Sequence, residues 1–435
     1  MAEQGEVLCR SLSEGLLAPA GERQPGKPEW AGVLQYVADL HRRSLHPPEP
    51  PLRFEWEEIG PGYCYGPAFG HFDLVHQVLD LVADRPEVAR RQMLNLLALQ
   101  RQDGFIPFVW MGENPARTWL APGTPMAARL KAAGTFPPLW PVAVEACLAV
   151  RPDNELLETA CNALGRLLAW FGANRRSADG GYFYEDIRGE GRWESGMDQG
   201  VRFADPPPEP AACVDATSHV FWCRRFAAAW AVRLGKDAGR HEEAMAELGR
   251  VVRTGLFCDE TAWFHDAWTV RDPARRHLAF EGMWPIVVGA AGADQAAAAL
   301  TGSLLNPDRF NTPHPIATVA RSDPAFELRM WRGPAWNSMT LWAAEACLRH
   351  GRPDGAAELL GKALDDTASQ FERTRTVWEF YHPLGGEPET LTRKPGRPVK
   401  GPCRDYLGHN PIQAMARLWA GRNACPRAGG LPYGR

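Results

Sequence analysis

The segment WESGMDQGVRF, residues 193–203, places two carboxylates, Glu194 and Asp198, between aromatic side chains and an arginine. Glycines interrupt any regular hydrophobic period around it and prolines follow, so residues 178–211 are predicted to form a loop. Long loops in compact domains are usually functional or disordered, and the many large aromatic rings here argue against disorder. We therefore expect an ordered, acidic site loop. The alternative is a surface loop with charges at its tip.

A second carboxylate lies in the segment TVWEFYHPLGGEPE, where Glu379 stands between Trp378 and Phe380 and is followed by Tyr381. Cleaving a glycosidic bond requires a proton donor and an opposing carboxylate, so two acidic groups on separate loops fit this chemistry. The alternative is that Glu379 pairs with one of the arginines that precede it.

The apolar neighbours of Asp198 include Met197, Trp193 and Phe203. Desolvation by such neighbours would raise the carboxyl pKa and keep the group protonated, as a general acid requires. The alternative is that Asp198 caps a helix or a turn.

A third cluster is MWRGPAWNSMTLW, in which Pro334 is predicted to begin a helix. Trp331 and Arg332 precede this proline and Trp336 follows it within the first turn, so all three could project from a helix end into a cavity. The alternative is that Trp336 and Trp342 belong to the hydrophobic core.

The elements that must position these residues are helices, because apolar residues recur with helical spacing and period-2 alternation is scarce. Roughly twelve helices joined by alternating short and long connections predict an all-α, closed toroid whose long connections build a cavity at one end. No repeat of fixed period is visible. The predicted helices span residues 30–45, 73–83, 86–101, about 136–150, 154–171, 214–234, 237–254, 280–290, 293–304, 334–350, 354–373 and 409–420.

We expect one catalytic domain over residues 29–425, between a loosely ordered lead-in, residues 1–28, and a tail, residues 426–435. The formal net charge of −4 gives no reason to expect nucleic acid or an anionic membrane as a partner. No window approaches a membrane span, and the first residues lack the pattern of a secretory signal, so a cytoplasmic location is expected.

The ten cysteines form no close pair of the zinc-ligand kind, and reduced thiols are expected. The His, Asp and Glu spacings do not converge on a metal site, so neither a metal nor a cofactor is expected. The oligomeric state is left open.

The motifs WESGMDQGVRF, MWRGPAWNS and WEFYHPLGGE, in this order, resemble signatures of glycoside hydrolase family 63 and its relatives, which include trehalases and bacterial mannosylglycerate and glucosylglycerate hydrolases. FGHFDLVH, QRQDGFIP, TFPPLW and LLNPDRFNTPHPIATV resemble further segments of that family. The resemblance covers about residues 60–420.

The resemblance implies an (α/α)6 barrel that hydrolyses an α-glycoside with inversion, with Asp198 as general acid and Glu379 as general base. Inversion requires carboxyl groups roughly 6.5 to 9.5 Å apart, with a water between the base and the sugar. Asp73 matches an aspartate that binds sugar hydroxyls, and Glu194 takes a supporting role. The candidate substrate-binding residues are Phe72, Asp73, Gln102, Gly104, Trp193, Glu194, Arg202, Trp331, Arg332, Trp336, Tyr381 and His409.

The chain departs from the family pattern at Phe72, where tryptophan is usual, and at Met330, where tyrosine is usual. The stretch after Glu379 is also longer and more basic than expected. We expect a solvated loop there; the alternative is that one of its cations reaches the cavity and pairs with a carboxylate or phosphate of the substrate aglycone. These cations are Arg393, Lys394, Arg397, Lys400 and Arg404.

The sequence therefore predicts an inverting α-glycosidase acting on a small α-glucoside or α-mannoside, of the disaccharide or glycosylglycerate type. Two alternatives stay open: a non-catalytic sugar-binding protein on the same toroid, and a toroid polysaccharide lyase. A lyase needs a Tyr or His base beside a charge-neutralising group, and the sequence offers no clear pair of that kind.

Overall fold

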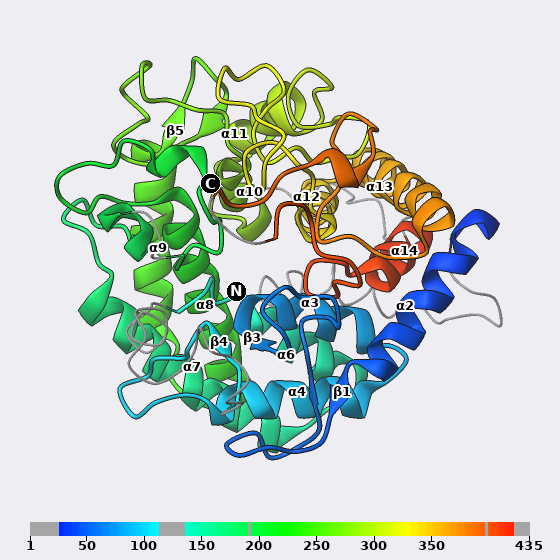
Figure 1. Ribbon diagram of the computed structural model, residues 1–435. Coiled ribbons are helices and arrows are strands. Elements are labelled where there is room, and N and C mark those ends of the chain that lie inside the picture. Colours follow the sequence, from blue (N-terminus) through cyan, green and yellow to red (C-terminus); the bar gives the residue numbers. More distant parts are fainter. Residues whose placement is uncertain (1–25, 113–134, 190–192, 396–398, 422–435) are drawn as a thin grey trace.

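The computed structural model describes residues 26–112, 135–189, 193–395 and 399–421. Helices dominate these residues and follow one another around a ring (Figure 1). The helices are α2 (Ala31–Arg43), α3 (His71–Leu81), α4 (Pro86–Ala98), α6 (Trp140–Val150), α7 (Asn154–Asn174), α8 (Val214–Arg233), α9 (Gly239–Gly255), α10 (Trp284–Val288), α11 (Ala293–Ala299), α12 (Asn337–Arg349), α13 (Pro353–Thr374) and α14 (Ile412–Gly421).

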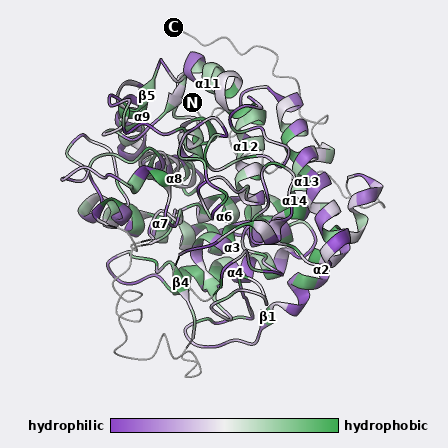
Figure 2. Ribbon diagram, turned by 45° about the horizontal axis from the view of Figure 1, so that its top comes forward, coloured by the Kyte–Doolittle hydropathy of each residue, from purple (hydrophilic) through white to green (hydrophobic). Residues whose placement is uncertain are grey.

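The helices form an inner and an outer layer. Helices α3, α10 and α12 are buried along almost their whole length, whereas α2, α9 and α13 bury one side and expose the other. Figure 2 shows hydrophilic residues along the outer helices α2 and α13. Helix α14 contacts α3 and α13, and so joins the end of the helical region to its beginning. This is the (α/α)6 toroid that the sequence predicts.

The strands are short and pair within the long connections. Each sheet has two antiparallel strands: β1 (Leu45–His46) with β2 (Trp56–Glu57), β3 (Phe69–Gly70) with β4 (Val109–Trp110), and β5 (Phe257–Cys258) with β6 (Trp263–Phe264). The β3–β4 pair leads directly into α3, and therefore fixes the start of a helix that carries a candidate site residue.

The predicted helices are confirmed, with differences at their ends. The helix predicted to start at Pro334 begins instead at Asn337, because Ala335 forms backbone bridges with Ala317 and Tyr381 that hold this stretch extended. The loop predicted over residues 178–211 is a loop with two short 3₁₀ turns, Glu185–Arg188 and Val201–Phe203. Most of the predicted lead-in and the whole predicted tail lie outside the described residues. None of the helices in the described ranges is long and apolar enough to cross a membrane.

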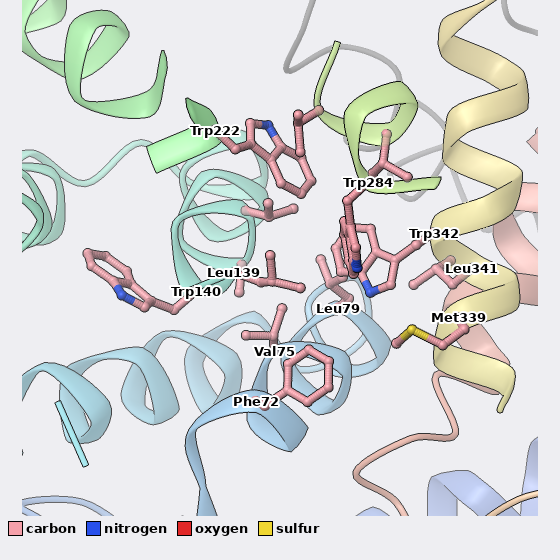
Figure 3. Close-up of a cluster of buried hydrophobic side chains, with 14 of the residues drawn as sticks. Phe72, Val75, Leu79, Leu139, Trp140, Trp222, Trp284, Met339, Leu341 and Trp342 are labelled. Atoms are coloured by element: carbon pink, nitrogen blue, oxygen red, sulfur yellow. The ribbon is translucent and has the colours of Figure 1, made fainter. Parts of the chain in front are cut away.

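Large aromatic side chains fill the centre of the ring. Trp222 from α8, Trp284 from α10 and Trp342 from α12 converge there, beside Leu79 of α3 (Figure 3). The ring centroids of Trp342 lie 5.7 Å from Trp222 and 5.8 Å from Trp284. Trp342 is fully buried, so it belongs to the core rather than to a cavity wall. Tryptophan fills this wide helical interior because it buries more apolar surface than other side chains.

A buried ionic group braces the closure of the ring. His41 of α2 contacts Glu57 of β2 at 2.7 Å and Asp80 of α3 at 3.0 Å, and Asp80 also accepts a hydrogen bond from the backbone of Ala414 in α14 at 2.7 Å. Burial disfavours the charged imidazole, but the two carboxylates outweigh burial and raise the pKa of His41 to about 10.

Replacing His41 with glutamine is expected to lower the free energy of unfolding by about 3–5 kcal/mol at pH 6, because two buried carboxylates lose their cation. The pKa of His41 is raised in the folded state, so its contribution is fully present below the unfolded pKa of 6.5. That contribution is lost as the pH rises through about 10, and the difference between wild type and His41→Gln therefore shrinks over this range. Denaturant titrations at several pH values measure this difference in the free energy of unfolding.

The matched control is Arg42→Gln, since Arg42 lies next to His41 on α2 but forms an exposed pair with Asp39. It is expected to cost less than about 1 kcal/mol at any pH. Equal losses for the two variants, or a His41→Gln loss that is constant from pH 6 to pH 10, would contradict the assignment.

Candidate functional site

The long connections build a cavity with an empty volume of about 540 Å³, counting the part open to solvent. Residues far apart in the chain meet in its wall. The lining residues are Ile59, Tyr63, Tyr65, Phe72, Asp73, Phe108, Val109, Phe136, Gly196, Asp198, Met330, Trp331, Trp336, Glu379, Arg393, Lys394, Tyr406 and His409. Both carboxylates expected to act on a glycosidic bond are among them.

The loop that carries Asp198 is held from behind by buried polar contacts. Glu194 accepts hydrogen bonds from the Arg175 guanidinium at 2.7 and 3.1 Å, and from the backbone N–H groups of Thr135 and Glu185. Glu194 is 1% exposed, and burial raises its pKa. With its oxygens directed at these donors, Glu194 orders the loop and does not line the cavity.

Two further features fix the same loop. Ser195 donates from its backbone N–H and its hydroxyl to Asp186, at 2.8 and 2.9 Å. Gly196 has φ +75, and a Cβ there would stand 3.3 Å from the ring of Phe72, so glycine lets the loop approach the start of α3. Asp198 follows two residues later and faces the cavity.

Asp198 forms an ion pair with Lys394. The side chain of Lys394 is 9% exposed, and its Nζ lies 5.0 Å from the ring centroid of Trp193. A buried cation therefore lies against this carboxylate, close to the apolar ring of Trp193.

Glu379 is 1% exposed and is held by three donors. The Arg393 guanidinium donates to both carboxylate oxygens, at 2.8 and 2.6 Å, and the backbone N–H of Cys403 donates at 2.9 Å. The backbone N–H of Glu379 in turn donates to the Cys403 carbonyl at 2.8 Å. This bidentate geometry fixes the plane of the carboxylate.

Asp73 lies in the first turn of α3. The Tyr406 hydroxyl donates to its Oδ1 at 2.8 Å, and His409 Nε2 lies 3.6 Å from the same oxygen. A Cβ at Gly408 would stand 2.2 Å from Oδ1, so only glycine fits at that position. Burial raises the pKa of Asp73 to about 7, and the nearby carboxylates of Glu379 and Asp198 add to this effect.

Aromatic rings form the apolar wall of the cavity. Trp331 and Trp336 stack with ring centroids 3.8 Å apart and an interplanar angle of 5°. His409 packs its edge against both rings and bonds Ser338 Oγ through Nδ1 at 2.7 Å, which leaves Nε2 on the side of Asp73. Phe280 stacks on Trp331 and Phe380 lies against Trp336, so the two tryptophans, 2% and 1% exposed, form a packed apolar wall beside the carboxylates.

Several expected site residues lie elsewhere. Gln102 is exposed and Gly104 packs against the backbone of Arg166, so this turn braces the outside of α7. Tyr381 is buried, stacks on His314 at 4.6 Å, and accepts a hydrogen bond from the Trp378 backbone.

Trp193 and Arg332 line a neighbouring cavity of about 500 Å³ rather than the one that contains the carboxylates. Arg332 pairs there with Glu327 at 2.8 Å.

Arg202 also lies outside the carboxylate cavity, because its guanidinium is bonded to three other carboxylates. It donates to Glu281 at 3.0 Å and to Asp266 at 2.7 Å, and forms an ion pair with Asp215. Burial raises the pKa of Asp266 to about 6 and that of Glu281 to about 7.

Among the described residues, Cys213, Asp215 and Asp266 form a group whose possible ligand atoms lie within 4.8 Å of one another. Arg202 already supplies a cation to both of these carboxylates.

The expectation of a solvated loop after Glu379 is wrong for two of its cations, because Arg393 and Lys394 are buried in the cavity while Lys400 and Arg404 are exposed. Arg397 lies outside the described residues. In a glycine- and proline-rich segment, the spacing of the cations does not indicate which side chains point into the cavity. The physical reason is the buried charge of Glu379, which requires a cation beside it.

The sequence interpretation also missed a group of aromatic residues that complete the wall. Glycines and prolines hide these residues from any helical or strand period, although the density of aromatic residues in GYCYGPAF was a usable signal. They are Tyr63, Tyr65, Phe108, Phe136 and Tyr406.

Solved structures support the fold. A glycoside hydrolase family 63 mannosylglycerate hydrolase from Thermus thermophilus, in complex with Tris and D-glycerate, superposes with a TM-score of 0.66 at 17% identity, covering 89% of this chain and 99% of that one. The neutral trehalase of Saccharomyces cerevisiae superposes with a TM-score of 0.63 at 14% identity, covering 91% of this chain and 82% of that one. At these identities the similarity establishes the architecture.

A model of one protein family matches residues 70–398, the region that contains both cavity carboxylates and the two buried cations. The chain therefore belongs to the family described as the mannosylglycerate hydrolase MGH1-like glycoside hydrolase domain.

Proposed function

We propose that the protein is an inverting glycosidase that hydrolyses a small α-glucoside or α-mannoside, with Asp198 as general acid and Glu379 as general base. The observation that carries the proposal is that both carboxylates line one cavity, together with Asp73 and the stacked Trp331 and Trp336. An inverting reaction requires room for a sugar and a water between the acid and the base.

The two carboxylates differ in a way that suits their roles. Glu379 is fixed on both oxygens by Arg393, so it can hold a water in one orientation. Asp198 is paired with the Lys394 ammonium, and a proton donor must lose that partner before it can act. Sugar entry separates Lys394 from Asp198 in this proposal, and the faces of Trp193 and Tyr65, 5.0 and 5.9 Å from Nζ, remain to hold the ammonium.

Two buried cations in the cavity favour a glycosylglycerate over a neutral disaccharide. A carboxylate on the aglycone gives Lys394 a new anionic partner when it leaves Asp198, whereas a neutral aglycone leaves the ammonium with aromatic faces alone. The Thermus thermophilus relative was solved with D-glycerate, and this supports the same aglycone here.

The ion pairs on both carboxylates also favour an alternative function, that of a sugar-binding protein without turnover.

Incubation with a panel of α-linked disaccharides and glycosylglycerates, followed by NMR, distinguishes an inverting glycosidase from the alternatives. Initial release of the β-anomer supports inversion, and release of the α-anomer contradicts it. An unsaturated product indicates a lyase, and binding without any product indicates the sugar-binding protein.

Asp198→Asn and Glu379→Gln are each expected to lower turnover by about 10²–10⁴, because each removes one proton transfer of the reaction. Initial rates on the best substrate of the panel measure this, with circular dichroism to show that the fold is kept. Asp205→Asn is the control, since Asp205 is an exposed carboxylate of the same loop and should keep full turnover. Near-normal turnover in either site variant removes that residue from its role.

Lys394→Met is expected to lower kcat/KM for α-mannosylglycerate about tenfold more than kcat/KM for α-mannosylglycerol, which lacks the carboxylate. A hydrogen-bonded charge contributes about 1.5–3 kcal/mol, and only the charged aglycone loses it. The ratio of the two substrates cancels any effect of Lys394 on Asp198. Lys400→Met, an exposed lysine of the same segment, should leave the ratio unchanged. An unchanged ratio in Lys394→Met would show that this lysine does not recognise the aglycone.

A further inference from the structure

Two cysteines that the proposed reaction does not use meet behind Glu379. Cys64 lies between Tyr63 and Tyr65, which both line the cavity, and Cys403 bonds Glu379 through its backbone. Cys64 packs against the apolar cluster that contains Cys403, although the two residues lie near opposite ends of the chain.

The backbones around these thiols are packed together, so the contact is built into the fold. A Cβ at Gly62 would stand 1.8 Å from the Arg404 carbonyl oxygen, and only a glycine permits this approach. Three residues further along each stretch of chain, the Leu407 backbone N–H donates to the Ile59 carbonyl at 2.8 Å. These contacts lie just before Cys64 and just after Cys403, and they bring the two backbone stretches together.

The charges around the pair make the two thiols unequal. Arg393 Nη1 donates to Cys64 Sγ at 3.1 Å. The hydrogen bond from Cys403 and the charges of Arg393 and Lys394 lower the pKa of Cys64, against the opposing effects of burial and of Glu379. The pKa of Cys403 is raised, first by its hydrogen bond to Cys64 and then by burial. Cys64 is thus the more acidic thiol of the two, and Cys403 the less acidic one.

The other thiols in the described ranges lack this environment. Burial raises the pKa of Cys147, Cys161, Cys213, Cys223 and Cys347. Cys161 is half-buried like Cys64, but no cation of the described part of the chain is bonded to its sulfur, so it is a matched comparison for accessibility without activation. Thiolate character together with access determines which cysteine an oxidant attacks.

We propose that Cys64 and Cys403 form a peroxide-sensitive pair, in which Cys64 is oxidised first and Cys403 then closes a disulfide behind Glu379. The Cys64 thiolate attacks one oxygen of hydrogen peroxide, the O–O bond breaks, and sulfenic acid and water result after one proton is taken up. The Cys403 sulfur then attacks the sulfenic sulfur, an S–S bond replaces the S–O bond, and a second water leaves. Two thiols and one peroxide thus give one disulfide and two waters.

The test treats the purified full-length protein with hydrogen peroxide, blocks free thiols with an alkylating agent, and digests it with trypsin without reduction. Cleavage after Lys400 and Arg404 releases Cys403 in a short peptide, separate from the peptide that contains Cys64. A linked pair of these two peptides is expected, and dithiothreitol should remove it. Cys64 is expected to be lost from the free-thiol pool about tenfold faster than Cys161.

Variants separate the two steps. Cys403→Ser should stop the reaction at a Cys64 sulfenic acid, which dimedone traps, and Cys161→Ser should leave the linked peptide unchanged. Cys64→Ser should abolish the link, and the Cys403→Ser result stands even where Cys64→Ser does not fold. Oxidation of Cys161 as fast as Cys64, or the lack of a linked peptide in wild type, would overturn the proposal. This readout needs no substrate, so it is independent of the roles proposed for Asp198 and Glu379.

Discussion

The carboxylates inside this ring must be neutralised by the protein, and this constraint explains much of the site. Glu379 is 1% exposed, and its charge is tolerated because Arg393 bonds both oxygens. The same segment brings Lys394 to Asp198. The segment that follows Glu379 therefore supplies both positive charges that balance the carboxylates of the cavity.

The rule recurs outside the cavity. Arg202 is bonded to three buried carboxylates, and His41 joins α2 to α3 at the closure of the ring. Removing one partner of such a group leaves a buried charge uncompensated, which costs more than the group contributes when complete. These clusters therefore specify how helices and loops meet, while the tryptophans in the centre supply most of the apolar burial.

The helices were predictable because amphipathic spacing is a local property, and their order was enough to indicate a ring. The position of Asp198 and Glu379 in one cavity was predictable only through the resemblance of their motifs to a known family. The position of Arg202 could not be predicted, because the sequence around it does not indicate the three distant carboxylates that pair with it in the fold. The burial of Arg393 and Lys394 could not be predicted either, because the carboxylates that pair with them are brought close only by the fold.

The charges in the cavity can be counted against the proposed substrate. Asp73, Asp198 and Glu379 offer three negative charges, and Arg393 and Lys394 offer two positive ones. In the proposed mechanism Asp198 carries a proton as the general acid; with a second proton on Asp73, whose pKa burial raises to about 7, the cavity would carry one net positive charge. A single anionic aglycone then makes the complex neutral, whereas a neutral disaccharide leaves a buried cation uncompensated. The charge balance thus connects the basic segment to the glycosylglycerate proposal, since a buried site is most stable when its charges cancel.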